Sequence, residues 1–69
     1  MDSLEMFFIF RAAIEDEKRA QERYRKAMRT AEDDPELHQI FGLILHEEEH
    51  HERRLVELYQ RFRAQHLDS

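Results

Sequence analysis

The sequence predicts an all-α fold, an antiparallel hairpin of two long helices that pairs with a second copy into a four-helix bundle. Three observations lead to this fold class. The 69 residues include one Gly and one Pro, and the helix-forming residues Ala, Leu, Glu, Arg, Lys and Gln are abundant. Apolar residues recur in both halves at alternating spacings of three and four. A chain of this length rarely supplies enough core alone, so a metal or oligomerisation is expected to stabilise it.

The first helix is expected over residues 3–31, with Asp2 or Ser3 as its N-cap. Its apolar stripe consists of Phe7, Phe10, Ile14, Glu17, Gln21, Tyr24, Met28 and Ala31. The central residues Glu17 and Gln21 are polar and interrupt the stripe there and nowhere else. The opposite face is expected to be solvated: Asp16, Lys18, Arg19, Arg23, Arg25 and Lys26. Phe8 and Ile9 lie beside the stripe, which we interpret as contact with another subunit rather than membrane insertion.

The second helix is expected over residues 35–65, after a turn at residues 32–34. Asp34 is a favourable N-cap and Pro35 a favourable first helical residue. The apolar stripe of this helix consists of Leu37, Phe41, Ile44, Glu48, His51, Leu55, Leu58 and Phe62. Its central residues, Glu48 and His51, are again polar. A short connection between two long amphipathic helices predicts an antiparallel hairpin, so residues 1–69 form one domain, half of a four-helix bundle.

Charge and composition exclude several classes of partner and of metal site. The chain has 16 acidic and 11 basic residues and a net charge of −5, which disfavours a nucleic-acid partner. The absence of Cys excludes disulfides and thiolate metal sites. No stretch approaches the roughly 20 apolar residues of a membrane span, and no secretory signal is evident. We therefore expect a cytoplasmic protein without a membrane partner.

The polar residues at the centres of the two stripes predict a metal site. Glu17 lies 16 residues before residue 33, and Glu48 lies 15 residues after it. At a rise of about 1.5 Å per residue, Glu17 therefore comes level with Glu48 and His51, and all three are expected to point inward. Two hairpins related by a two-fold axis would bring together four Glu and two His, the ligand inventory of di-iron carboxylate bundles. Carboxylates with imidazoles suit iron, and manganese or zinc could substitute.

Two other pairs of residues compete with this assignment. Glu47 and His50 also have the Glu-x-x-His spacing, but their row continues into Arg54 and Arg61, which indicates a solvated surface. His46 and His50 could form a surface zinc site, although simple exposure is expected. The histidines near the helix ends are expected to be ordinary surface residues: His38 and His66.

The sequence also resembles a known family. Residues 13–20 (Ala-Ile-Glu-Asp-Glu-Lys-Arg-Ala), followed by Tyr24, resemble the first metal-binding helix of the rubrerythrin branch of the ferritin-like superfamily. Residues 48–51 (Glu-Glu-His-His), followed by Leu55, resemble the second. The likeness covers about residues 7–62 and is greatest to the two-helix encapsulated ferritins, which dimerise to complete a ferroxidase centre and assemble into a ring.

The resemblance implies that Glu17, Glu48 and His51 are catalytic iron ligands and that Tyr24 lies directly behind them. It also implies a homodimer at minimum. Beyond the dimer, it suggests assembly into a larger homo-oligomeric ring and an encapsulating shell protein as a partner. The chain departs from the family pattern in two respects. No targeting extension is evident after the second helix, and an additional acidic entry site is matched only in part, by Glu15 and Asp16.

The function expected from these observations is ferroxidase activity, the oxidation of Fe(II) to Fe(III) with O₂ or peroxide at a site shared by two subunits, with two iron ions per dimer. The alternative is a non-catalytic helical oligomerisation module in which Glu17, Glu48 and His51 form a buried polar network that fixes register. Tyr24 could then be a core aromatic residue, and Gln21 could be a residue that sets the register.

Overall fold

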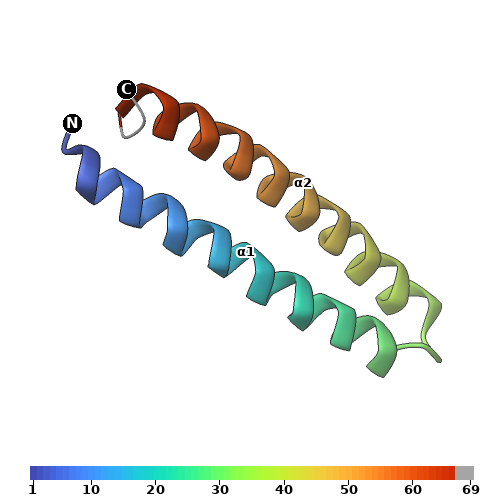
Figure 1. The fold of residues 1–69 in the computed structure, drawn as a ribbon. Coiled ribbons are helices and arrows are strands. Elements are labelled where there is room, and N and C mark those ends of the chain that lie inside the picture. Colours follow the sequence, from blue (N-terminus) through green and yellow to red (C-terminus); the bar gives the residue numbers. More distant parts are fainter. Residues whose placement is uncertain (67–69) are drawn as a thin grey trace.

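The protein is a hairpin of two antiparallel helices. The computed structural model describes residues 1–66, in which helix α1 spans Ser3–Thr30 and helix α2 spans Pro35–His66. The helices lie side by side over their whole length, and both ends of the described chain lie at the end opposite the turn (Figure 1). The hairpin is a rod of 52 × 16 × 15 Å. Compared with the expected ranges, α1 ends one residue earlier, and α2 extends one residue further.

A side chain from just outside each helix accepts hydrogen bonds from backbone N–H groups in the first turn of that helix. The Asp2 carboxylate accepts hydrogen bonds from the backbone N–H groups of Leu4 and Glu5, at 3.0 and 3.1 Å. The Asp34 carboxylate accepts a hydrogen bond from the backbone N–H of Leu37, at 3.2 Å. Both aspartates are therefore N-caps of the kind that the sequence predicts, and they fix where the two helices begin.

The turn is closed by contacts between the end of α1 and the start of α2. His38 is half-buried, and its Nδ1 lies 2.9 Å from the backbone carbonyl oxygen of Met28. This carbonyl belongs to the last turn of α1 and has no partner within the helix. The interpretation of His38 as an ordinary surface residue is therefore wrong. It joins the two helices because its position, one turn into α2, faces the end of α1.

The contact between the helices is a narrow seam rather than an enclosed core. Ile14, Gln21 and Phe62 are the only buried side chains within residues 1–66. At the open end of the hairpin the aromatic rings interlock, with Phe10 5.7 Å from Tyr59 and 5.5 Å from Phe62 between ring centroids. Two helices can cover only one side of each other, so most apolar residues of the stripes remain half-exposed.

Several large apolar side chains face outward. Leu37, which lies on the predicted stripe of α2, is 46% exposed because it is at the end of the hairpin. Phe8 and Ile9 are 59% and 51% exposed, in agreement with their predicted position beside the stripe. The other strongly exposed apolar residues lie towards the two ends of the rod: Met1, Leu4, Ile40 and Leu43. Within residues 1–66, neither helix is long and apolar enough to cross a membrane.

Candidate metal centre

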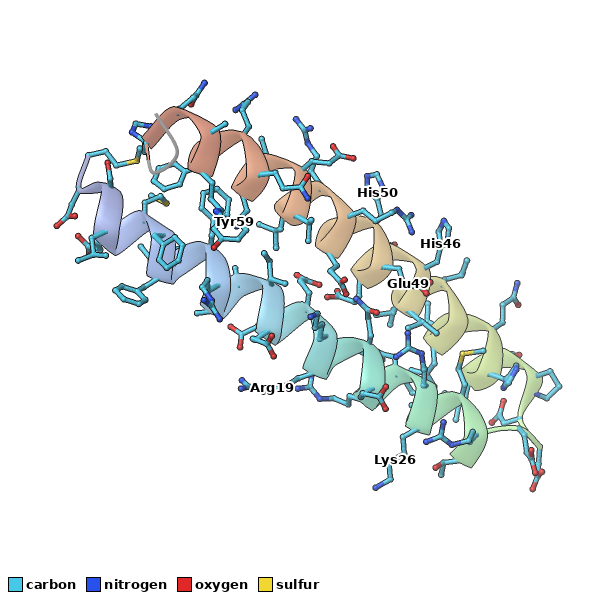
Figure 2. All side chains as sticks on the ribbon, in the orientation of Figure 1. Arg19, Lys26, His46, Glu49, His50 and Tyr59 are labelled. Carbon is cyan, nitrogen blue, oxygen red and sulfur yellow. The ribbon has the colours of Figure 1, made fainter. Side chains whose placement is uncertain are left out.

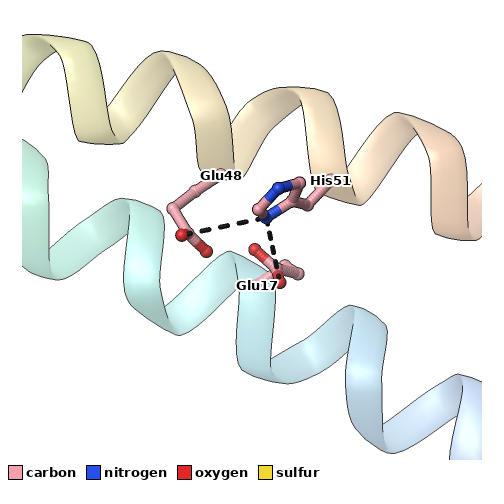
Figure 3. A group of neighbouring side chains, drawn as sticks. All are labelled: Glu17, Glu48 and His51. Carbon is pink, nitrogen blue, oxygen red and sulfur yellow. Dashed lines mark ion pairs between the residues drawn. The ribbon is translucent and has the colours of Figure 1, made fainter.

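The two helices bring Glu17, Glu48 and His51 together halfway along the rod. One ligand atom from each residue lies within 4.8 Å of the other two. The Nδ1 atom of His51 is 3.8 Å from Oε1 of Glu17 and 3.9 Å from Oε1 of Glu48 (Figure 3). Glu48 and His51 are one turn apart on α2, and Glu17 reaches them from α1 because the antiparallel hairpin places it level with them. Hereafter these three residues are the Glu-Glu-His group.

The three side chains differ in their burial. The side chains of Glu17 and Glu48 are 20% and 21% exposed, whereas that of His51 is 55% exposed. The expectation that all three point inward therefore agrees with the direction of His51, whose Nδ1 faces both carboxylates, but the imidazole is not buried. With only two helices there is no surface to cover the imidazole, which lies at the open edge of the seam. The group thus has one enclosed side, formed by the carboxylates, and one side open to approach.

Glu17 is the least well satisfied residue of the group in its hydrogen bonds and charge. Its Oε2 atom is buried and has no hydrogen-bond partner within the described chain. The pKa of Glu17 is raised from 4.5 to about 6, because its carboxyl group shares a hydrogen bond with Glu48, because it is partly desolvated, and because Glu48 carries like charge. The positive charge that His51 can carry acts in the opposite direction. Two carboxylates so close together favour either a shared proton or a cation.

This donor set fits a hard or borderline divalent cation. Carboxylate oxygens and one imidazole nitrogen are ligands that iron, manganese and zinc accept. The unpartnered Oε2 of Glu17 supplies an additional lone pair, which a cation would satisfy. Within residues 1–66, the Glu-Glu-His group is the one cluster of three or more acidic or histidine side chains whose ligand atoms approach one another closely enough to hold an ion.

The competing sequence motif lies on the outside of the hairpin. Glu47, His50 and His46 are all exposed. Figure 2 shows the side chains of His46 and His50 pointing away from α1. Because successive helical positions are rotated by about 100°, a shift of one residue moves a side chain off the face that meets the other helix. The residues at 46, 47 and 50 therefore cannot share a metal ion with a side chain from α1.

Tyr24 lies two turns after Glu17 on α1 and is half-buried. Its ring stacks on that of Phe41 from α2, with the ring centroids 6.2 Å apart. Within the described residues, its hydroxyl makes no hydrogen bond to Glu17 or Glu48. In the single hairpin Tyr24 thus serves as a packing residue, and its role behind the metal ligands stays a prediction.

A polar network beside the group was only partly foreseen. Gln21 is 6% exposed and donates a hydrogen bond from Nε2 to Oε1 of Glu52, at 2.7 Å. Arg25 donates from Nη2 to Oε1 of Gln21, at 3.3 Å, and lies 3.9 Å from Glu49. The interpretation of Arg25 as part of a solvated face is therefore wrong. The missed signal is a spacing of four residues, between Gln21 and Arg25 and between Glu48 and Glu52, which places each pair on one helix face.

Comparison with known proteins identifies a family for the chain. No curated protein and no solved structure matches the chain. A family described as a ferritin-like domain (Ferritin) matches residues 4–64, which include both helices and all three members of the Glu-Glu-His group. The match covers most of the chain, and we conclude that this protein belongs to the ferritin-like domain family.

Proposed function

We propose that this protein is a ferroxidase that oxidises Fe(II) to Fe(III) at a di-iron centre shared by two copies of the chain. The observation that carries this proposal is the Glu-Glu-His group, held between two helices in a chain of the ferritin-like family. A helical module that used these residues only to fix its register would be expected to satisfy their hydrogen bonds. The buried, unpartnered Oε2 of Glu17 argues against that alternative.

Each residue of the group has a distinct task. Glu17 and Glu48 supply anionic oxygens that become favourable ligands as the charge of iron rises from +2 to +3. His51 binds through a neutral ring nitrogen, so its binding and that of Glu17 require the loss of protons and weaken in acid. Iron is the substrate here. Each of two Fe(II) ions loses one electron, and the two electrons with two protons reduce O₂ to hydrogen peroxide, or peroxide to water. Manganese or zinc could occupy the same ligands.

The second copy supplies what one hairpin lacks. Each chain offers two carboxylates and one imidazole, so two chains provide the four Glu and two His of a di-iron carboxylate bundle. The exposure of His51 leaves the group open on one side, and the large apolar residues exposed at both ends of the rod offer surface that a second copy could cover. The resemblance of the two metal-binding segments to the rubrerythrin branch, and to encapsulated ferritins in particular, supports a dimer and extends the proposal to a larger ring.

The deciding experiment measures Fe(II) oxidation by stopped flow in four alanine variants. We expect Glu48→Ala and His51→Ala to lose rapid oxidation, because each removes a ligand of the group. Glu47→Ala and His50→Ala are the matched controls, since each replaces the same residue type one position away on the exposed face. We expect both controls to oxidise Fe(II) at close to the wild-type rate. All variants are first compared in helicity and oligomer mass, because replacing a buried carboxylate can alter stability by itself.

Iron stoichiometry provides a second, independent measurement. We expect the wild-type protein to bind about one iron per chain, or two per dimer, as in carboxylate-bridged bundles built from this ligand set. Activity that is lost in the Glu47 and His50 variants but kept in the Glu48 and His51 variants would refute the assignment. A wild-type oligomer that binds no iron would favour the non-catalytic module. In that case the hydrogen-bonded Gln21 would be the residue that sets the register.

A further inference from the structure

Gln21 occupies an unusual position for a neutral polar residue. It is one of three buried side chains in the described part of the chain, and it lies on the same face of α1 as Glu17, one turn further on. Helical side chains lean towards the N-terminus of their helix. The amide of Gln21 therefore reaches back to the level of Glu48 on α2, where its Nε2 lies 3.5 Å from the Glu48 carbonyl oxygen.

The strong contact of this amide is with Glu52. The distance of 2.7 Å between Nε2 of Gln21 and Oε1 of Glu52 is that of a charge-assisted hydrogen bond, whereas the contact with the Glu48 carbonyl is long. Glu52 lies one turn after Glu48 and directly after His51 in the sequence. It faces the same helix seam as the metal ligands, yet its carboxylate is bonded to Gln21 and is not part of the Glu-Glu-His group.

Arg25 determines which way the amide of Gln21 points. A guanidinium can only donate hydrogen bonds, and an ionised carboxylate can only accept them. Since Arg25 donates to Oε1 of Gln21 at 3.3 Å, the amide must present its NH₂ group to Glu52. Arg25 also contacts Glu22 on its own helix, at 2.9 Å, which holds the guanidinium in place. The three side chains thus form a chain of hydrogen bonds with one direction.

From these contacts we propose that Gln21 is a positioning residue for the metal centre. Its amide, oriented by Arg25, ties α1 to the segment of α2 that carries Glu48 and His51, and it keeps Glu52 from competing with them as a ligand. This proposal rests on the proposed function of the Glu-Glu-His group. Hydrogen-bond partners behind metal ligands set ligand orientation, and their loss typically lowers metal affinity by about 10- to 100-fold.

The test uses Co(II) as the probe, because its visible absorption depends on the number and arrangement of its ligands. Gln21→Met keeps the length of the side chain and removes its hydrogen bonds. We expect it to bind Co(II) at least about tenfold more weakly than the wild type and with a changed spectrum. Gln60→Met is the matched control, since Gln60 is exposed on α2, and we expect no change in it.

A reciprocal exchange distinguishes positioning from general stability. Gln21→Glu alone places a second carboxylate against Glu52 and no longer holds Glu52 by an amide. We therefore expect a Co(II) spectrum that differs from that of the wild type, because residues 21 and 52 can then act as additional ligands. Adding Glu52→Gln to Gln21→Glu restores the hydrogen bond with donor and acceptor exchanged, and residue 21 still accepts from Arg25. We expect the double variant to regain the wild-type spectrum and most of the affinity. If Gln21→Met does not fold, this rescue decides the question.

The outcomes separate this inference from the proposed function. Wild-type Co(II) binding that is lost in Glu48→Ala, together with an unchanged spectrum and affinity in Gln21→Met, would overturn the role of Gln21 alone. Failure of the double variant to regain the spectrum would also overturn it. A wild-type protein whose Co(II) binding does not depend on Glu48 would instead refute the metal centre itself.

Discussion

Replacing Glu17 by Gln should stabilise the metal-free protein at neutral pH. Its pKa is raised from 4.5 to about 6, chiefly through its hydrogen bond with Glu48 and its partial burial. Between these two pH values the folded chain binds more protons than the unfolded chain. The free energy of unfolding therefore decreases as pH rises through this window, and the loss is complete above the folded-state pKa. Gln is neutral at every pH and can still donate a hydrogen bond to Glu48.

The magnitude follows from the size of the pKa change. The difference between 4.5 and about 6 corresponds to about 2 kcal/mol if the group were fully shielded. The side chain of Glu17 is 20% exposed on a seam open to water, and solvent screening reduces the expected gain to about 1 kcal/mol. For a domain of this size that gain raises Tm by about 4–8 °C at pH 7. At about pH 3, which is well below both pKa values, Glu17 is protonated in both states and the two proteins should have equal stability.

The assay is thermal and urea unfolding followed by circular dichroism, in the presence of a chelator and at one protein concentration, because oligomerisation makes stability depend on concentration. Glu47→Gln is the control, since it makes the same chemical change on the exposed face. Adding Zn(II) should stabilise the wild type but not Glu17→Gln, which reverses their order. A Glu17→Gln protein that is less stable at pH 7, or whose advantage persists at about pH 3, would refute the reasoning.

Three further predictions concern the hairpin. Gly42→Ala should stabilise the hairpin by about 0.5 kcal/mol. The gain in helix propensity is about 1 kcal/mol, and the new Cβ, 3.2 Å from Cε of Met28, displaces only the end of a flexible side chain. A lower free energy of unfolding in urea would mean that Met28 cannot move. Asp34→Ala should cost about 1 kcal/mol in the same assay, because Leu37 loses its cap, and Asp34→Asn should recover most of it. Ultracentrifugation should detect no folded monomer at micromolar concentration, because side chains such as Phe8 are more than half exposed in the single hairpin; a helical monomer would contradict this.

Much of the hairpin is encoded locally, which is why the sequence predicted it. Asp34 and Pro35 fix the start of the second helix through short-range capping and a fixed backbone angle. The level position of Glu17 with Glu48 and His51 follows from counting residues on either side of a short turn. Such features depend on chain geometry that hardly varies from one helix to another.

Side-chain surroundings were harder to predict. Periodicity placed His51 on the apolar stripe, but it could not show that a two-helix seam leaves the imidazole 55% exposed. It also grouped Arg25 with the solvated residues, although the guanidinium reaches across to Gln21 and Glu49. Long side chains span more than one turn, so the identity of their partner depends on how closely the helices approach each other and at what rotation.

The sequence by itself determined an all-α hairpin, its turn, and the face that carries Glu17, Glu48 and His51, because helix periodicity and capping act over a few residues. Only the tertiary structure decided that Oε2 of Glu17 is buried without a partner, that the pKa of Glu17 is raised, and that Gln21 bonds to Glu52. These properties depend on distances of a few ångströms between atoms of different helices. Such distances are set by packing along the whole seam, and no local pattern encodes them.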